Sequence, residues 1–212
     1  MPGTAKAVLR PGGVRARTRA LLVDAAVRVF ARDGTDAAIH EIAAEAGVAN
    51  GTFYNYFRTR EELVAAASAR LAERFHGAIA ASRTAVDDPA ERLAVGCRRF
   101  ILQAISDPVW GAAIVRVWGR TSRLNDATAA ALQADLRAGR RRGRFTFANE
   151  AVAVDLVGGT VLAGMRRVLE GDAGEAHAAA IAAAILRGLG VPDADAVARR
   201  PLPPLRADAT RA

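Results

Sequence analysis

The sequence predicts an all-α protein of about nine helices, and three observations support this prediction. Apolar residues make up 51% of the chain and include many alanines, the best intrinsic helix formers, whereas aromatic residues make up only 5%. Apolar positions recur with the period of a helix along most of the sequence. Glycine and proline separate these segments at positions typical of helix ends, and no segment shows the alternating pattern of a half-buried strand.

The N-terminal part opens with residues 1–14, which contain glycine and proline without apolar periodicity and are expected to form a disordered basic arm. A long helix is expected from about Arg17 to Asp33, because one stripe of this segment is apolar. Gly34 follows at the position where glycine commonly ends a helix. The residues of the stripe are Leu22, Ala26, Val29 and Phe30.

Two short helices and a long one follow this first helix. The short helices are expected over 38–46 and 50–56, with Gly47 between them, and the long one over 60–86. Most of the later helices are bounded by capping residues, prolines or glycines, as in Asp88-Pro89. They are expected over 88–105, 107–118, 125 or 126 to 138, 150–169 and 175–189, before a disordered Pro- and Arg-rich tail over 192–212.

Composition excludes several classes of protein. The single cysteine, Cys97, excludes an internal disulfide and a zinc finger, and the three histidines stand too far apart in sequence for a metal site. We therefore expect neither a metal nor a cofactor. No apolar run is long enough to span a membrane and no signal peptide is evident, so we expect a cytoplasmic protein without membrane contact. The net charge of +8 favours a polyanionic partner only weakly, because the chain uses arginine almost to the exclusion of lysine.

The stretch 39–57, IHEIAAEAGVANGTFYNYF, predicts a helix-turn-helix. Ala46-Gly47-Val48 joins its two short helices, since glycine allows the chain to turn tightly. Phe53 and Phe57 are expected to anchor the second helix to the core. The opposite face carries amides and hydroxyls, which can bond base edges and phosphates in a major groove of about 12 Å width. These polar positions are Asn50, Thr52, Tyr54 and Asn55.

This stretch resembles the tetracycline-repressor (TetR) family of bacterial transcriptional regulators. The matching motifs are Ile42-Ala43, Ala46-Gly47-Val48, Gly51-Thr52-Phe53-Tyr54, Tyr56-Phe57 and Arg60-Glu61-Glu62-Leu63. Their spacing matches without a gap over about residues 15–75, whereas residues 88–190 share only the helical architecture. The resemblance implies a DNA-binding domain over 15–75 and a ligand-binding and dimerisation domain over 76–191.

The resemblance and the polar face of the second helix together predict the residues that contact DNA. Tyr54 is expected to contact phosphate because Phe53 and Phe57 already fill the buried positions, whereas Tyr56 is equally consistent with a core role. Whether the cations of the first helix contact phosphate or only face water also stays open. The predicted DNA-contacting residues are Arg17, Arg19, Ala38, Ile39, Asn50, Gly51, Thr52, Tyr54, Asn55, Tyr56 and Arg60.

Three positions depart from the family pattern. Members usually carry Thr or Ser where this chain has Ala38, and many carry Ser where it has Ala49. Losing a helix cap costs about 1 kcal/mol, so either Asn50 caps the recognition helix or that helix is weak until DNA orders it. Arg60 replaces the usual lysine at the start of the long helix and keeps its charge.

The resemblance also implies a ligand cavity within residues 88–170. The candidate walls are Phe100, Trp110, Val117, Trp118 and Met165, although each is also consistent with an ordinary core position. Arg116 and Arg120 are candidate anchors for an acidic ligand, or they simply face water. Cys97 is expected to be a small core residue rather than a redox sensor, and the arginines over 140–144 a solvated loop.

The small residues of the last two helices favour close helix packing and predict a homodimer through residues 150–190, built as a four-helix bundle. The leading hypothesis is therefore a repressor that a small-molecule effector releases from a palindromic, double-stranded operator. A non-specific nucleoid protein is one alternative, but residues 1–76 hold 11 basic and 8 acidic residues, a net charge of only +3. A helical enzyme is another, although no catalytic triad, metal spacing or phosphate-binding glycine loop supports it.

Overall fold

The computed structural model describes residues 11–84, 86–121 and 126–205, and every regular element in these ranges is a helix. The all-α prediction is confirmed, with ten helices rather than about nine. Their bounds are α1 Pro11–Asp33, α2 Ile39–Glu45, α3 Asn50–Phe53, α4 Arg60–Thr84, α5 Pro89–Ser106, α6 Pro108–Thr121, α7 Asp126–Arg141, α8 Glu150–Leu169, α9 Glu175–Gly188 and α10 Ala194–Ala198.

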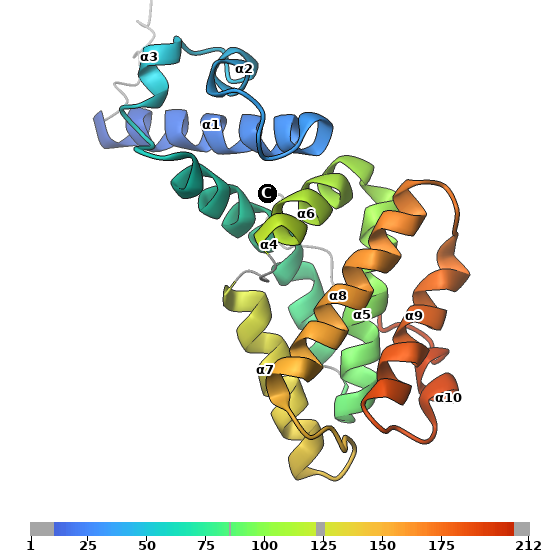
Figure 1. The fold of residues 1–212 in the computed structure, drawn as a ribbon. Coiled ribbons are helices and arrows are strands. Elements are labelled where there is room, and N and C mark those ends of the chain that lie inside the picture. Colours follow the sequence, from blue (N-terminus) through green and yellow to red (C-terminus); the bar gives the residue numbers. More distant parts are fainter. Residues whose placement is uncertain (1–10, 85, 122–125, 206–212) are drawn as a thin grey trace, which may run out of the picture.

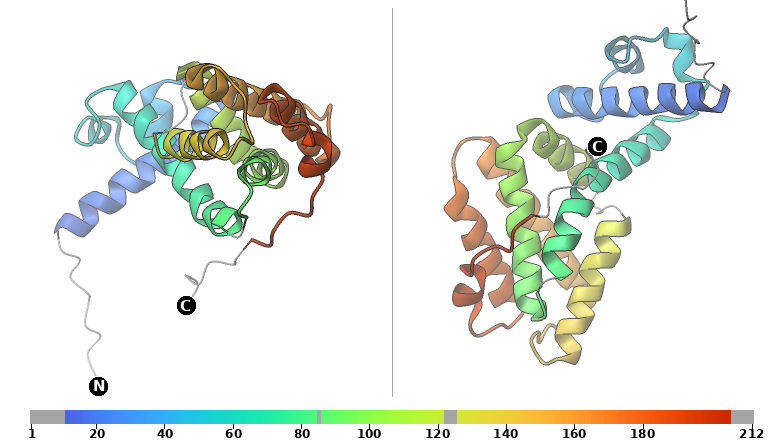
Figure 2. Two further views of the ribbon diagram at one scale, coloured as in Figure 1. Left: turned by 90° about the horizontal axis from the view of Figure 1, so that it is seen from below. Right: turned by 180° about the vertical axis from the view of Figure 1, so that it is seen from behind.

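The helices form two units that α4 joins (Figure 1). Helices α1, α2 and α3 make a small N-terminal unit, and α5 to α10 make a larger bundle beneath it. Helix α4 starts beside the small unit and runs down into the bundle, while α6 lies across the top of the bundle against α1. The view from behind shows the same arrangement (Figure 2). Among the helices of the described ranges, α4 alone runs from one unit into the other.

The core of the N-terminal unit follows the apolar stripe expected for α1. Leu22, Ala26, Val29 and Phe30 are all fully buried, as are Ile42 of α2 and Phe53 of α3. The turn between α2 and α3 depends on Gly47, whose φ of +69° lies in the left-handed region that glycine tolerates best. This local geometry places α2 and α3 as a helix-turn-helix on top of α1.

Several helix ends differ from the sequence-based expectation. Helix α1 already begins at Pro11, a residue well suited to the first helical position, so residues 11–14 belong to a helix rather than to the expected arm. The other residues of that arm, 1–10, lie outside the described ranges. Helix α3 ends at Phe53 rather than near Tyr56, because the amides of Tyr56 and Phe57 both bond the carbonyl oxygen of Phe53 and close a turn.

The structure also corrects the expected disordered tail. Residues 194–198 form α10, and its Ala194, Val197 and Ala198 are buried against the bundle. The backbone beyond α10 is held too, since the guanidinium of Arg98 on α5 donates to the carbonyl oxygen of Arg200 at 2.6 Å. A short apolar stripe within a Pro- and Arg-rich segment thus suffices to dock the chain.

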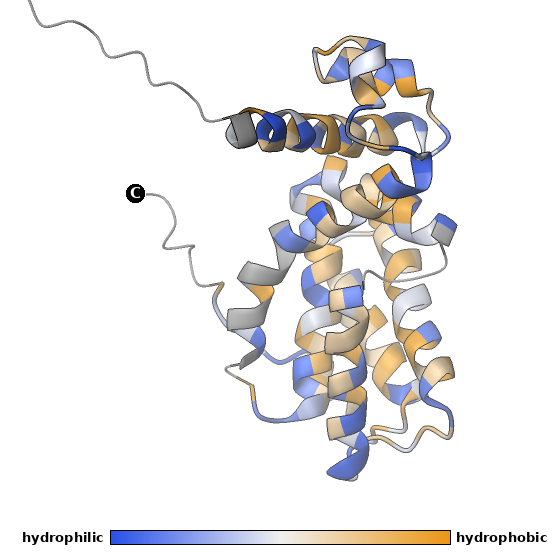
Figure 3. Cartoon of the chain, turned by 90° about the vertical axis from the view of Figure 1, so that its left-hand side faces the viewer, coloured by the Kyte–Doolittle hydropathy of each residue, from blue (hydrophilic) through white to orange (hydrophobic). Residues whose placement is uncertain are grey.

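Helix α5 is the centre of the bundle and contacts α4, α6, α7, α8, α9 and α10. Its start is capped as the sequence predicts, with Asp88 Oδ1 accepting from the amide of Ala90 at 3.1 Å and Pro89 at the first position. Figure 3 shows hydrophilic and hydrophobic residues side by side on the helices, as expected for amphipathic helices around a shared core. None of the described helices has the length and apolarity needed to cross a membrane.

Replacing Gly47 with alanine should lower the free energy of unfolding by about 1–2 kcal/mol, because an L-residue in the left-handed region brings its Cβ too close to the following carbonyl oxygen. Gly51→Ala is the matched control, since an added Cβ there meets no atom within 4 Å and alanine favours helix. Urea denaturation at fixed protein concentration, followed by circular dichroism, measures both. Equal destabilisation by the two substitutions would contradict the special role of the turn.

Candidate DNA-binding site and ligand cavity

The second helix of the helix-turn-helix, α3, lies at the outer end of the molecule, far from the bundle (Figure 1). Its Asn50 and Gly51, and Tyr54 and Asn55 just beyond it, are exposed, while Thr52 is half-buried. Tyr54 is 57% exposed, whereas Phe53 and Phe57 are fully buried. Three of the four predicted polar positions are thus exposed, and the two phenylalanines anchor the unit as expected.

The N-terminal half of α1 supports the chain that follows α3. The guanidinium of Arg15 donates to the carbonyl oxygen of Asn55 at 3.3 Å and lies 5.9 Å from the ring centroid of Tyr56. The Arg19 guanidinium lies 4.8 Å from the ring centroid of Phe57. Sequence reasoning missed Arg15, although its spacing of four residues from Arg19 places both on one face of α1.

The two alanine caps have different consequences. Ala49 is the N-cap of α3 and makes no side-chain cap bond, and Asn50 is already the first helical residue, so Asn50 does not replace the missing cap. At α2, Ala38 also lacks a side-chain acceptor, but the Glu41 carboxylate accepts from its amide at 2.8 Å. Half of a capping box therefore remains at α2 and none at α3.

Arg60 opens α4, as the sequence predicts, and braces the N-terminal unit. Its Nη1 donates to the carbonyl oxygens of Thr35 at 2.9 Å and of Ala37 at 2.5 Å, in the loop between α1 and α2. Ala38 and Ile39, which follow this loop, are half-buried. Among the other predicted cations, Arg17 is exposed on α1.

Arg116 and Arg120 of α6 do not reach a ligand cavity, contrary to the candidate role considered for them. Arg116 Nη1 donates to the carbonyl oxygen of Ala31 at 2.6 Å, at the C-terminal end of α1, where a cation interacts favourably with the helix dipole. Arg120 pairs with Asp36, just beyond α1. Both arginines therefore fasten α6 to the N-terminal unit.

The two tryptophans of α6 bind α4 on the other side. The indole N–H of Trp110 donates to the carbonyl oxygen of Leu71 at 3.1 Å, and that of Trp118 donates to Ser68 Oγ at 2.9 Å. Both side chains are only 2% exposed, and a buried indole N–H needs such a partner. Helix α6 is thus bonded to α1 through its arginines and to α4 through its tryptophans.

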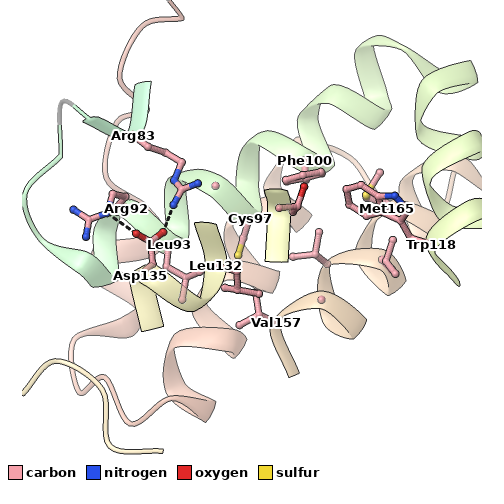
Figure 4. Close-up of a pocket in the computed structure, with 15 residues that line it drawn as sticks. Arg83, Arg92, Leu93, Cys97, Phe100, Trp118, Leu132, Asp135, Val157 and Met165 are labelled. Atoms are coloured by element: carbon pink, nitrogen blue, oxygen red, sulfur yellow. Dashed lines mark hydrogen bonds and ion pairs between the residues drawn. The ribbon is translucent and has the colours of Figure 1, made fainter. Parts of the chain in front are cut away.

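A cavity of about 70 Å³ lies between α4, α5, α6, α7 and α8 (Figure 4). Phe100, Trp118 and Met165, three of the expected ligand-contacting residues, line it. Trp110 does not line it, although its ring centroid lies 6.0 Å from that of Phe100. Most of the other wall is apolar, formed by Leu93, Cys97, Leu132, Val157, Val161 and Leu162.

One end of the cavity is charged. Asp135 of α7 is 6% exposed and accepts at Oδ1 from Arg92 Nε at 2.7 Å and at Oδ2 from Arg83 Nη2. Figure 4 shows the two arginines converging on this carboxylate. Sequence reasoning missed this cluster. The available signal was an acid in the apolar stripe of α7, between Leu132 and Leu136, which are both buried.

A larger groove of about 550 Å³ lies outside the cavity, between the end of α6 and helices α7 and α8. The groove and the cavity share Trp118, Gly158 and Leu162 as walls.

Models of protein families match both units of the chain. Residues 22–67 match the model described as "Bacterial regulatory proteins, tetR family", and residues 88–200 match "Tetracyclin repressor-like, C-terminal domain". The comparison with curated proteins gave no match.

Solved structures agree with the family models. RolR without ligand is 31% identical with a TM-score of 0.71, covering 88% of this chain and 99% of RolR. RolR in complex with the ligand resorcinol is 30% identical with a TM-score of 0.68, covering 92% and 99%. The fatty acid degradation regulator FadR from Bacillus halodurans is 22% identical with a TM-score of 0.65, covering 80% and 98%, and supports the fold alone.

Cys97 should not react with Ellman's reagent at pH 8 in the folded protein. Burial raises the pKa of its thiol to about 12, with the nearby charge of Arg83 acting in the opposite direction, so about one thiol in 10,000 is ionised at that pH. Full reaction is expected once guanidinium chloride unfolds the chain, and this serves as the control. Rapid reaction of the folded protein would instead mean that the cavity opens readily to solvent.

Proposed function

Because the chain belongs to the TetR family of bacterial transcriptional regulators, we propose that it is a repressor that a small-molecule effector releases from operator DNA. The N-terminal unit reads the operator through α3, and the bundle holds the effector in the cavity beside Trp118. One observation carries this proposal: the same helices, α4 and α6, line the cavity and bond the DNA-binding unit.

The bonds along α4 and α6 support coupling between the two sites. At one end of α4, Arg60 holds the loop between α1 and α2, and at the other end Arg83 lines the cavity. Between them, the Arg70 guanidinium binds Asp24 of α1 with contacts of 2.9 and 3.3 Å. An effector that shifts these helices would tilt the N-terminal unit. For this to work, the DNA-binding and the released states of the protein must bind the effector with different affinities.

The chemistry of the cavity supports a compact effector with a mostly apolar surface. Its wall is apolar apart from one charged end, a composition typical of small-molecule sites. The structure of RolR that contains resorcinol adds support, because that protein is about 30% identical over nearly the whole chain. The effector class we propose is accordingly a single-ring molecule rather than the acidic ligand that Arg116 and Arg120 would have required.

A direct test starts from the DNA upstream of the chain's own gene. Footprinting of this DNA with the purified protein should protect an inverted repeat, because two reading heads related by a two-fold axis contact half-sites about 34–36 Å apart or a multiple of this. Resorcinol is then titrated into the complex while operator binding is followed by fluorescence anisotropy. Protection without any repeat, or with every DNA tested alike, would contradict sequence-specific regulation.

The exposed faces of α8 and α9 support a homodimer through residues 150–190. One exposed stripe of α8 is small or apolar, with Val152 62% and Leu156 36% exposed and Gly159 and Ala163 further along the same stripe. Gly164 is a different case, since an added Cβ there would meet Ile101 and Ile181 of the same chain at 3.0 Å. Gly164 therefore packs inside the protomer, and the proposed seam runs along Gly159 and Ala163.

Asn55→Ala and Thr52→Ala should reduce discrimination between operator and random DNA by about 1–3 kcal/mol each, the size of a lost base contact. Arg17→Ala should instead weaken binding to both DNAs alike. It should also reduce the slope of log affinity against log salt concentration by about 1. Binding isotherms at several salt concentrations measure both effects. Loss of specificity in Arg17→Ala but not in the other two would refute this assignment of roles. Arg60→Ala is less informative, because it also removes the bonds that hold the α1–α2 loop.

Ala163→Arg should convert the dimer to monomers at micromolar concentration and abolish operator binding, because it places a long cation in a seam of small residues. Ala134→Arg is the matched control, since Ala134 is also an exposed helical alanine but lies on α7, outside the proposed seam. Sedimentation velocity reports the mass of each variant. Monomers in both variants, or dimers in both, would count against the seam.

A further inference from the structure

The charged end of the cavity contains a donor that the protein leaves unused. Arg83 Nε is buried, lies in the cavity wall and has no hydrogen-bond partner among the described residues. The other end of the same guanidinium bonds Asp135 through Nη2, so the side chain is held in place and cannot simply turn toward water. A buried N–H without a partner costs free energy, and a bound ligand is one way to recover it.

The acceptor beside this donor also has spare capacity. Each carboxylate oxygen of Asp135 accepts one bond from an arginine, Oδ1 from Arg92 and Oδ2 from Arg83. A carboxylate oxygen can accept more than one hydrogen bond. The cluster therefore presents an unused donor and unused acceptor lone pairs side by side at the cavity surface (Figure 4).

We propose that Arg83 and Asp135, held together with Arg92, form the subsite that recognises a hydroxyl group on a compact ring. This inference deepens the proposed function and rests on it. A hydroxyl group donates once and accepts, so it can accept from Arg83 Nε and donate to Asp135 in a single position. A ligand carboxylate only accepts and would face the negative charge of Asp135, and a methyl group satisfies neither partner.

The size and shape of the cavity favour one ring. Its volume of about 70 Å³ is below the roughly 150 Å³ of an engineered apolar cavity that binds benzene, so even one ring requires the walls to move slightly. Phe100 and Trp118, with ring centroids 5.8 Å apart, offer aromatic contacts beyond the charged end. A long acyl chain does not fit this space without a much larger rearrangement.

Recognition by Arg83 has a structural consequence, because Arg83 lies in the last turn of α4. A ligand bonded there contacts directly the helix whose first residue, Arg60, holds the α1–α2 loop. The hydroxyl group would thus act on the coupling helix itself, while the ring displaces the apolar walls.

The test compares phenol, toluene and benzoate, three compounds of similar size, by isothermal titration calorimetry on the full-length protein. Phenol should bind about 10- to 100-fold more tightly than toluene or benzoate, the range expected for hydrogen bonds to charged partners. Arg83→Lys keeps the charge but removes the Nε–H, and it should lower the phenol-to-toluene ratio about tenfold while leaving toluene affinity unchanged, because the hydroxyl then keeps only its bond to Asp135. Arg137→Lys, which alters an ion pair between α7 and Glu150 of α8 outside the cavity, should preserve the full ratio.

Several outcomes would overturn the inference. Equal affinity for phenol and toluene would show that the hydroxyl is not recognised, and tightest binding of benzoate would make the site an anion site instead. Equal weakening of both phenol and toluene by Arg83→Lys would assign Arg83 a purely structural role, and failure of all three compounds to bind would remove the ring-sized subsite. The proposed function fails separately, if phenol binds with the expected selectivity but leaves operator affinity unchanged.

Discussion

The fold depends on the way α4 is fastened at both of its ends. At its start, Arg60 bonds two carbonyl oxygens of the loop that leads into α2, and near its end Arg83 bonds Asp135 across the bundle. Helices are stiff over this length, so a displacement at one end is carried to the other. The hydrogen bonds from the indoles of Trp110 and Trp118 hold the middle of α4 against α6. The N-terminal unit is therefore positioned by the bundle rather than by a flexible linker.

Arginines make most of the long-range polar contacts, and the surrounding charges determine what each of them does. Asp88 illustrates the balance: burial works against its ionisation, but bonds from Arg144 and the amide of Ala90 outweigh this and lower the pKa of the carboxyl group. Arg144 also reaches Asp193 ahead of α10, so the loop after α7 is tied to the starts of both α5 and α10. The cluster over 140–144 thus includes a structural member, which goes beyond the solvated loop that composition alone suggested.

The features that could be predicted from sequence are those encoded by neighbouring residues. The helix-turn-helix follows from a local apolar pattern and a glycine turn, and the anchoring role of Phe53 and Phe57 follows from their spacing. The charged end of the cavity could not be predicted in this way, because Asp135 lies 52 residues from Arg83 and 43 from Arg92. Helix α10 was missed because its short stripe lies within a segment whose composition is typical of disorder.

The placement of Arg116 and Arg120 could have been deduced with the helical period alone. Each lies two residues from Trp118, and two residues correspond to about 200° around a helix, so both must face away from that tryptophan. If Trp118 lines a cavity, these arginines face something else, and the structure shows that this is the end of α1.

The same geometry explains how a small cavity can influence a distant surface. A ring too large for about 70 Å³ can enter only if the walls move, and densely packed walls shift as units rather than deforming locally. Two of the helices that form the wall, α4 and α6, are the ones bonded to the N-terminal unit. Filling the cavity therefore changes the relative free energies of the different positions that α1 and α3 can take. A ligand that fits without moving the walls would bind both arrangements equally and would shift nothing, however tightly it bound. The tightness of the cavity is thus a requirement for coupling, and enlarging it would separate ligand binding from the response.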